Sequence, residues 1–393
     1  MQQVIPAVVA GGNLNGLGVV RSLARIGVPI YLMAATRLCP AAWSRECTFV
    51  RATNMHGEAF IQALLRLAGQ LKCRPVLMLT LDTSVLTVSA QRQRLEPFYH
   101  FDLPPAPIVD ALSDKLAFAA LAAREGLPVP RGCALHSESD LGNLNDLASP
   151  MILKPADKGL VILGSVERAV RAQSHEEARA LATGMLAHAP AVIAQEWIEG
   201  ADSDIYFTLF VADRGALSAM FAGRKLLSSP PGVGSTAICV AAPDSAEVLG
   251  RMTQQFLERV PYQGIGSLEF KRDARNGRFM IIEPTVGRTD WQEEIATLCG
   301  VNLPAIGYQQ ALGHALPAQP LRADARSIAW RSDWAYRLPA EYRGRLRVTD
   351  GYFRWHDPLP AAYYYGYERG AARVWRRLRR ALRTITPQPS RGN

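Results

Sequence analysis

The chain has 393 residues, which is too long for one ordinary hydrophobic core and predicts two or three domains. Hydrophobic residues make up 48% of the chain and charged residues 20%, which is typical of a globular protein and excludes a largely disordered one. The net charge of +9 is concentrated at one end, because residues 369–393 hold eight arginines and no acidic residue. The net charge of the other residues is only +1, so no DNA-binding face is expected.

Apolar runs and cysteines narrow the class further. No apolar run is long enough to cross a bilayer, and the first residues lack the basic start of a signal peptide. The six cysteines have no C-x-x-C spacing and no cluster with histidine, which excludes an ordinary zinc site. We therefore expect a cytoplasmic protein with reduced cysteines, Cys39 and Cys47 included, and no specific nucleic-acid partner.

The first part of the chain alternates between strands and helices. In chain order we expect a strand over residues 4–10, a glycine turn over 11–18, a helix over 19–27, a strand over 28–34, a helix over 58–71 and a strand over 75–81. This βαβ order is typical of a parallel, Rossmann-like sheet. We expect that domain to cover residues 1–110.

The glycine turn lacks a dinucleotide fingerprint. Its glycines are at positions 11, 12, 16 and 18, whereas the fingerprint is G-x-G-x-x-G. The interpretation of the chain as a nicotinamide-dependent oxidoreductase is therefore supported by the βαβ unit alone. We interpret the glycines as serving a tight turn and close helix packing.

A different pattern begins at Ala111. Residues 111–126 predict a helix with Ser113 or Asp114 as its N-cap, followed by an extended Pro-x-Pro segment. The later elements are a strand over 149–156, a helix over 174–186, a strand over 191–198, two strands around the turn 212–215, and a hairpin with strands over 266–273 and 278–284.

Charged residues at the ends of these elements are the candidates for chemistry. Lys154 follows an apolar run, and a buried ammonium needs an anionic partner. The hairpin brings Glu269 and Glu283 together, and two close carboxylates repel unless a cation lies between them. The alternative is that the two acids form a solvated face. Mg²⁺, which favours a few carboxylates together with phosphate oxygens, would resolve the repulsion.

Taken in this order, residues 1–310 resemble the ATP-grasp superfamily. The resemblance rests on Asp114-Lys115 ahead of GLPVP, on Lys154-Pro155 at a strand end, on the strand at 191–198 and on the two acids of the hairpin. It implies an α/β and α+β fold, in which a Rossmann-like pre-ATP-grasp domain precedes a two-lobed ATP-grasp domain over residues 111–315. ATP and Mg²⁺ would bind between the two lobes.

The resemblance also implies which residues hold the nucleotide. Lys115 and Lys154 become the two lysines that supply positive charge to the triphosphate. Segment 159–165 takes the place of a glycine-rich loop over the phosphates, with Gly164 and Ser165 nearest the nucleotide, although its apolar residues are also typical of a buried strand. The implied adenine residues are Gln195, Glu196, Trp197 and Ile198, and the implied ribose acceptor is Asp202 or Asp204.

For the metal, the resemblance implies Glu269 and Glu283 bridging the β- and γ-phosphates through Mg²⁺. The family commonly continues from the second Glu with x-Asn-Pro-Arg, whereas this chain has Thr285 in the asparagine position. Thr285 is therefore a weaker candidate ligand, and Arg288 lies one residue out of register. Lys225, beside Arg224 and a glycine- and proline-rich loop, is a candidate for binding an anionic group.

The activity that the resemblance implies is ligation. A small-molecule carboxylate attacks the γ-phosphate of ATP, and an amine or similar nucleophile captures the acylphosphate, with Arg288 and Lys225 as catalytic candidates. The alternative, motivated by Thr285 and the apolar loop, is a nucleotide-binding protein of the same fold without ligase activity. The sequence leaves open whether the protein forms a homodimer.

Residues 316–393 form a C-terminal extension. An aromatic cluster in this extension indicates either packing within the chain or an interface with a partner; its members are Trp355, Tyr363, Tyr364, Tyr365 and Tyr367. After them, apolar residues at 371, 374, 375, 378, 382 and 385 form one helical stripe among arginines. A helix over 369–385 is suited to an anionic membrane surface, a partner protein or a polyanion, and we favour a peripheral position at the inner membrane surface.

Overall fold

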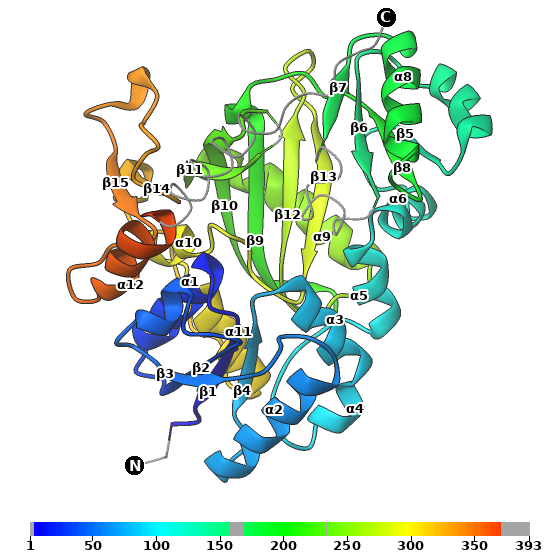
Figure 1. Cartoon of the computed structure of the whole chain (residues 1–393). Coiled ribbons are helices and arrows are strands. Elements are labelled where there is room, and N and C mark those ends of the chain that lie inside the picture. The colour runs from blue at the N-terminus through cyan, green and yellow to red at the C-terminus, as the bar shows by residue number, and fades with distance from the viewer. Residues whose placement is uncertain (1–3, 157–168, 233, 371–393) are drawn as a thin grey trace, which may run out of the picture.

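The computed structural model describes residues 4–156, 169–232 and 234–370, and these residues form three sheets (Figure 1). None of the helices in the described residues combines the length and the apolar character that a membrane span needs. Segment 159–165, with Gly164 and Ser165, and the greater part of the predicted basic helix lie outside the described residues.

Sheet A is the parallel sheet expected at the N-terminus. Its strands have the order β3-β2-β1-β4, and all three pairings are parallel. The strands are β1 (Ala7–Ala10), β2 (Ile30–Ala34), β3 (Thr48–Arg51) and β4 (Val76–Leu79), and the helices are α1 (Leu14–Ala24), α2 (Gly57–Leu71), α3 (Asp82–Ala90) and α4 (Arg92–Leu95). The Rossmann-like prediction is confirmed.

Helix α1 begins five residues earlier than its apolar pattern suggested. The side chain of Asn13 accepts a hydrogen bond from the Gly16 amide and caps the helix, so Gly16 and Gly18 lie inside it rather than in a turn. A Cβ atom at Gly18 would lie 2.5 Å from a carboxylate oxygen of Glu293. This glycine therefore permits the close approach of another part of the chain.

Sheet B forms a smaller lobe, in which every pairing is antiparallel and the order is β5-β8-β6-β7. The strands are β5 (Gly132–Leu135), β6 (Met151–Pro155), β7 (Val170–Ala172) and β8 (Val192–Glu196). Helix α8 (His175–Leu186) packs on the sheet, and the lobe has its own core, which includes Leu135, Leu153 and Met185.

Two helices lead into this lobe where the sequence predicted one. They are α5 (Ala106–Ser113) and α6 (Lys115–Arg124). Asp114 separates them because its backbone is extended, and its side chain accepts a hydrogen bond from the Ala117 amide. Asp114 is therefore the N-cap, and Lys115 is the first residue of a new helix.

Sheet C is the largest, with the order β13-β12-β9-β10-β11-β14-β15. Its strands are β9 (Ile205–Asp213), β10 (Ala216–Ser229), β11 (Ser235–Ala241), β12 (Gly264–Arg272), β13 (Phe279–Val286), β14 (Ile328–Arg331) and β15 (Arg347–Asp350). The helices that follow are α9 (Ala246–Arg259), α10 (Glu294–Leu298), α11 (Leu303–Ala311) and α12 (Leu359–Ala361). Short 3₁₀ segments are η1 (Pro40–Trp43), η2 (Glu138–Asp146), η3 (Asp202–Asp204), η4 (Pro243–Ser245), η5 (Ala325–Ser327) and η6 (Ala340–Tyr342), and the π-helical turn is η7 (Ala362–Glu368).

Sheets A and C share their hydrophobic cores. One continuous cluster includes Val8 of sheet A and Phe210 of sheet C, and another includes Val9 and Leu209. Helix α11 contacts β4 on one side and β9 and β12 on the other. The Rossmann-like part is therefore fixed against sheet C, whereas sheet B has a separate core.

The C-terminal segment is part of the same body. Strand β14 pairs antiparallel with β11, and β15 adds to β14 in parallel. The rings of Tyr352 and Tyr364 stack with centroids 3.7 Å apart, and the hydroxyl of Tyr365 donates to Asp350. Two of the clustered tyrosines, Tyr364 and Tyr365, therefore serve packing within the chain.

A buried ion network fastens this segment to helix α1. Nε of Arg21 donates to Asp357 at 3.1 Å, and its Nη1 and Nη2 donate to the carbonyl oxygens of Gly351 and Tyr352. The side chains of Arg21 and Asp357 are 4% and 1% exposed. Glu294, also buried, forms ion pairs with both Arg21 and Arg354. The last part of the chain thus locks onto the first helix.

Candidate active site

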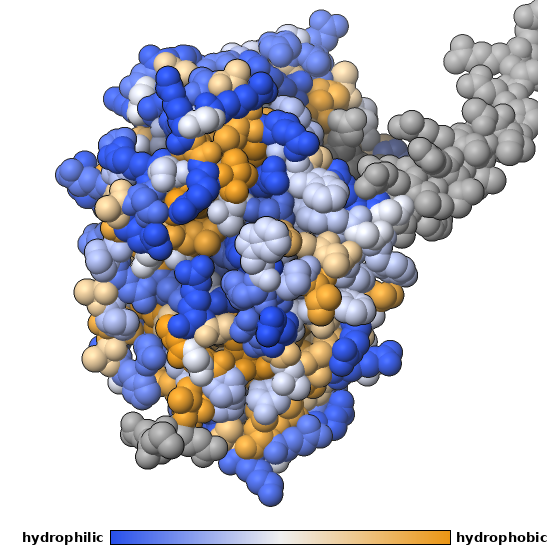
Figure 2. All heavy atoms as spheres, turned by 90° about the vertical axis from the view of Figure 1, so that its left-hand side faces the viewer, coloured by the Kyte–Doolittle hydropathy of each residue, from blue (hydrophilic) through white to orange (hydrophobic). Residues whose placement is uncertain are grey.

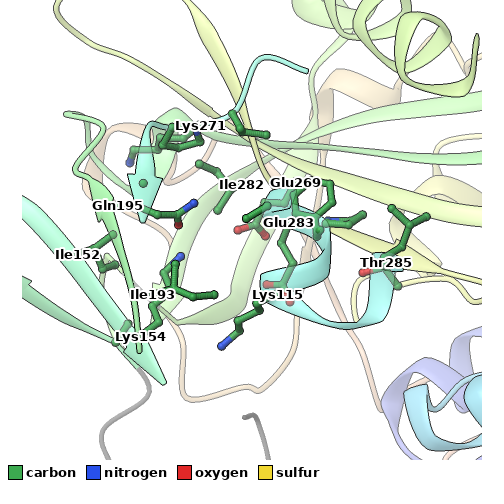
Figure 3. A pocket seen from close by; sticks show the side chains of 18 of the residues that line it. Lys115, Ile152, Lys154, Ile193, Gln195, Glu269, Lys271, Ile282, Glu283 and Thr285 are labelled. Carbon is green, nitrogen blue, oxygen red and sulfur yellow. The ribbon is translucent and has the colours of Figure 1, made fainter. Parts of the chain in front are cut away.

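A cavity of about 1360 Å³ opens between sheet B, sheet C and the carboxyl end of sheet A. Of the residues predicted from the sequence, those that line it are Lys115, Lys154, Gln195, Glu196, Trp197, Ile198, Lys225, Glu269, Glu283, Thr285 and Arg288. In Figure 3, Ile152, Lys154, Ile193 and Gln195 of sheet B lie on one side, Glu269 and Glu283 of sheet C lie on the other, and Lys115 of α6 lies close to the glutamates. Residues that lie far apart in the sequence therefore meet in one space.

The two predicted phosphate lysines lie at the same end of sheet B. Lys115 occupies the first turn of α6, and its Nζ donates to the carbonyl oxygen of Pro155 at 3.0 Å. Pro155 directly follows Lys154 on β6, so the Lys115 ammonium reaches the backbone beside Lys154. Two positive charges are thereby held at one edge of the cavity (Figure 3).

Apolar side chains line the cavity from sheet B and from sheet C. Ile152 and Ile193 come from neighbouring strands of sheet B, and Ile282 comes from β13 of sheet C. Gln195 pairs across the sheet with Ile152 and also lines the cavity. A planar, apolar ring with a polar edge fits between such side chains, because its faces contact the isoleucines while amide groups reach its edge.

Part of the predicted adenine segment is occupied by contacts within sheet B. The Trp197 amide donates to the Pro150 carbonyl at 2.9 Å, and the Arg171 guanidinium lies 4.6 Å from the centroid of the Trp197 ring. The Glu196 carboxylate accepts a hydrogen bond from the Ala148 amide at 3.0 Å. These contacts fix the shape of the segment, and Gln195 and Ile198 stay beside them on the cavity wall.

The structure does not bring Asp202 and Asp204 to the cavity wall. Asp202 accepts hydrogen bonds from the amides of Ser228 and Gly232, both at 2.7 Å. Asp204 pairs with Arg272 at 2.7 Å and accepts from the Ala201 amide. Carboxylates in short turns often satisfy nearby backbone amides, and in this turn, η3, that is what both acids do.

Lys271 lines the cavity at this end, although the sequence analysis did not single it out. It lies two residues after Glu269 on β12, so both side chains project from the same face of the strand. Its Nζ donates to the carbonyl oxygens of Gly200 and Ala201 at 2.9 and 2.6 Å. Burial lowers the pKa of Lys271, against the opposing effect of Asp204 and Asp202.

The two hairpin acids stand directly opposite each other in the β12–β13 register. After this pair the register shifts, because Phe270 faces Ile281 and Ile282 is left as an extra residue. Such a bulge re-aims neighbouring side chains, which explains why Ile282 and Glu283, though consecutive, both line the cavity. Figure 3 shows Glu269 and Glu283 side by side.

Lys225 reaches this acid pair from strand β10. Its Nζ lies 2.7 Å from Oε2 of Glu269, and its side chain is 4% exposed. Burial alone would lower the pKa of Lys225, but Glu269, Asp290 and Glu283 together raise it above its ordinary value. The ammonium therefore stays charged and offsets part of the negative charge of the two glutamates.

The donor atoms at this point fit Mg²⁺. Glu269, Glu283 and Thr285 offer hard oxygen atoms, which Mg²⁺ prefers, and it commonly takes only one or two carboxylates with substrate phosphates and water. In the described ranges 4–156, 169–232 and 234–370, no three His, Cys, Asp or Glu side chains gather as a ready metal site. The protein thus offers part of a coordination shell, which a phosphate group could complete.

Arg288 lies where sheet C meets sheet A. Its Nε donates to Asp82 at 2.5 Å, and its Nη1 lies 3.9 Å from Asp290. Burial alone would lower the pKa of Arg288, but Asp82, Asp290 and Glu283 raise it. Gly287, directly before Arg288, has a φ of +66°, and a Cβ atom there would lie 2.4 Å from Leu103, so a larger residue would not fit at this turn.

Sequence reasoning missed several cavity residues besides Lys271. Asp82 is the first residue of α3, three residues after the end of β4, at the carboxyl edge of the parallel sheet where ligands commonly bind. Asn13, Asn15, Asp290 and Gln292 also line the cavity. The position of Asp82 after a buried strand was a usable signal, whereas Asp290 and Gln292 lie in an irregular segment without one.

Known proteins share this architecture. No model of a protein family matches the chain. In sequence it is 24% identical over 321 residues to the D-aspartate ligase of Enterococcus faecium (strain Aus0004). The matched region covers 77% of this chain and 75% of that protein. In structure it is similar to N5-carboxyaminoimidazole synthetase of Staphylococcus aureus, with a TM-score of 0.63, 13% identity and 81% of each chain covered. Biotin carboxylase of Campylobacter jejuni, as a βγ-ATP complex, gives a TM-score of 0.61 at 15% identity, over 81% of this chain and 74% of that one.

Proposed function

We propose that this chain, which has the ATP-grasp fold, is an ATP-dependent ligase that joins a carboxylate to an amine or similar nucleophile. One observation carries the proposal. Lys115 of α6, Lys154 of sheet B and the glutamate pair of sheet C line the same cavity, with apolar side chains for a base beside them. The similarity to a D-aspartate ligase over three quarters of both chains supports the same class of reaction.

The reaction proceeds in two steps. An oxygen of the carboxylate attacks the γ-phosphorus of ATP, which gives an acylphosphate and releases ADP. The amine nitrogen then attacks the acyl carbon, phosphate leaves, and the amine loses a proton, so that the products are an amide, ADP and phosphate. The protein holds the reacting groups in line and offsets their charge.

Each set of residues has a part in that positioning. Lys115 and Lys154 hold the negative charge of the triphosphate at the edge of sheet B. Ile152, Ile193 and Ile282 hold the base, and Gln195 contacts its edge. Glu269, Glu283 and Thr285 would hold Mg²⁺, which neutralises phosphate charge when bound. Lys225 and Arg288 lie beyond the acids, where the acyl group would be activated.

We further propose that an amino acid is one of the substrates. Its carboxylate would bind near Arg288 and Lys225, and its ammonium group near Asp82 and Asp290, which lie on either side of Arg288. The Asp290 carboxylate is held in place by the Trp291 amide at 2.8 Å and by the Gln292 side chain at 3.3 Å. The activity named for the E. faecium relative, a D-aspartate ligase, agrees with this substrate class.

The test is ADP release in a coupled assay, with D- and L-amino acids screened against a panel of amines and acids in the presence of Mg²⁺. Glu283→Gln keeps the shape of the side chain and removes its charge, so we expect folded protein without ADP formation. Each active amino acid is then compared with its deaminated analogue. In the wild type the KM of the analogue should be higher than that of the amino acid, and in Asp290→Asn the difference between the two should be far smaller.

The outcomes separate the proposals. Full activity and unchanged Mg²⁺ dependence in Glu283→Gln would remove this residue from the metal site. ATP binding without ADP release for any substrate pair would favour the alternative, a nucleotide-binding protein without ligase activity. Equal use of amino acids and their deaminated analogues would refute the amino-acid subsite but leave the ligase proposal in place.

A further inference from the structure

A face of exposed aromatic and aliphatic side chains lies on the side of the molecule that carries α12. This aromatic face consists of five residues: Leu38 (59% exposed), Trp43 (42%), Trp355 (89%), Leu359 (53%) and Tyr367 (57%). Figure 2 looks onto this side and shows apolar groups reaching the surface among charged ones. The proposed catalytic site uses none of these five residues.

The five residues belong to one continuous surface. The Trp43 ring stacks on Tyr363 with centroids 5.6 Å apart, and Tyr363 contacts Tyr367 at the same separation. The Trp43 indole donates to the Arg37 carbonyl, which fixes the loop that carries Leu38. Segment η1, which contains Trp43, contacts α12, which begins at Leu359.

Trp355 is tied to the same surface through its neighbours. The Arg45 side chain donates to the His356 carbonyl at 2.9 Å, and the Arg45 amide donates to Asp357. The Trp355 ring contacts Phe353 with centroids 4.9 Å apart, which leaves most of the indole in solvent. Burial of such side chains away from water is favourable, so an apolar or interfacial partner would stabilise this face.

The chain that follows this face supplies the charge. Tyr367 is three residues from Gly370, the last described residue, and residues 371–393 contain seven arginines and no acidic residue. On the face itself the exposed Arg37 and Arg45 are balanced by Glu46 and Glu368, and Asp357 is buried against Arg21. An almost neutral aromatic surface is therefore followed in the sequence by a strongly basic segment.

We propose that the aromatic face, together with residues 371–393, docks this protein onto an anionic lipid surface. Tryptophan and tyrosine are favoured at the level of lipid headgroups because one end of each ring is apolar and the other is polar. Arginines near a membrane are attracted by its negative surface potential, and two weak anchors together give stable binding where one does not.

The test uses the full chain and co-sedimentation with vesicles of phosphatidylcholine alone or mixed equally with phosphatidylglycerol. We expect binding only to the anionic vesicles, and binding that weakens as salt is raised. Trp355→Ser with Leu359→Ser should lower the partition coefficient by about tenfold or more, since two exposed apolar groups no longer enter the interface. The matched control is Phe98→Ser with Leu321→Ser, two exposed apolar residues outside the face, which should bind like the wild type.

Four results would overturn the proposal: no sedimentation of the full chain, equal binding to both vesicle types, equal loss in the control variant, or wild-type binding by the Trp355→Ser, Leu359→Ser variant. The last result, combined with lost binding after deletion of residues 371–393, would make the tail the sole anchor. A full chain that forms a dimer and ignores vesicles, and that Trp355→Ser with Leu359→Ser converts to a monomer, would make the face a self-association surface instead.

Discussion

The ammonium group of Lys225 lies 2.7 Å from the carboxylate of Glu269, and Glu269 in turn stands opposite Glu283 in the hairpin. One cation therefore already offsets part of the charge of the two acids that we propose as metal ligands. If these acids hold the metal as proposed, Lys225 would have two opposed effects: it would restrain metal binding in the absence of nucleotide, and it would keep a positive charge beside the reacting groups.

Replacing Lys225 should separate these two effects. In Lys225→Met the acid pair keeps its full charge, so Mg²⁺ or Mn²⁺ should bind more tightly without nucleotide, while ADP formation falls by at least about tenfold. Titration calorimetry with Mn²⁺ and the coupled ADP assay measure the two quantities. Lys225→Arg, which keeps the charge, is the control. Unchanged metal affinity in Lys225→Met would show that the ion pair does not influence the acids.

Lys154→Ala should weaken ATP binding by about tenfold or more, because a partly buried ammonium no longer meets the phosphates. Calorimetric titration with a non-hydrolysable ATP analogue is the measurement. Arg66→Ala, which removes an exposed cation from helix α2 outside the cavity, is the control and should bind like the wild type. An affinity for Lys154→Ala within error of the wild type would remove this lysine from the site.

Glu293 makes stability depend on pH. Its pKa is raised to about 8, mainly by burial and further by the nearby Glu294. Hydrogen bonds from Ser22 and Thr297 act in the opposite direction and lower the pKa. Because the folded state binds this proton more tightly than the unfolded state does, the stability of the fold decreases as pH rises from about 4.5 to about 8. Glu293→Gln mimics the protonated form and should remove that dependence.

The expected gain for Glu293→Gln is on the order of 3 kcal/mol at pH 7, and it should nearly vanish at pH 4.5. Urea unfolding of the wild type and the variant at pH 5 and pH 8 measures the difference. The packing around Gly18, whose Cβ would lie 2.5 Å from this carboxylate, leaves no room for a larger side chain, so glutamine is the appropriate isostere. An equal stability difference at both pH values would contradict the assignment.

Arg21→Met should destabilise the fold by roughly 3–5 kcal/mol, because it leaves the buried Asp357 carboxylate without its cation and removes donors from Gly351 and Tyr352. Denaturant unfolding followed by tryptophan fluorescence measures this loss. In the double variant Arg21→Met with Asp357→Leu part of the stability should return, since no unpaired charge is left. Additive losses in the double variant would show that the two side chains do not interact energetically.

The sequence was most informative where a functional residue belongs to a regular element. The parallel sheet followed from strand and helix periodicity. Lys154, Glu269 and Glu283 could be singled out because each is a charged residue directly after apolar residues of a predicted strand; the structure places all three inside their strands. Asp82 was overlooked although its position after a buried strand was a usable signal. Lys271 was missed because its contacts are with the carbonyls of Gly200 and Ala201, which are distant in the sequence. Long-range pairing of this kind leaves no local pattern.

The same physical limit explains the other differences. Asp202 and Asp204 have the residue type that a ribose needs, but the backbone amides of a short turn compete for their oxygens. The bulge at Ile282, which turns Glu283 into the cavity, depends on how two strands align and not on either strand alone. Strands β14 and β15 are short, so periodicity did not reveal them. The partner of β14 is β11, which lies about 90 residues earlier in the chain, and β15 pairs only with β14.

The pairing of β14 with β11 has a consequence for how the chain is made. Until residues 328–331 have left the ribosome, β11 presents an unpaired strand edge, and such edges are templates for aggregation. Arg21 likewise waits for Asp357, 336 residues later, before its charge is matched in the interior. Completion of the fold therefore waits for residues 328–357, which predicts slow folding and a need for chaperones during synthesis. Chains that stop short of Ile328 should be recovered as aggregates rather than as active fragments.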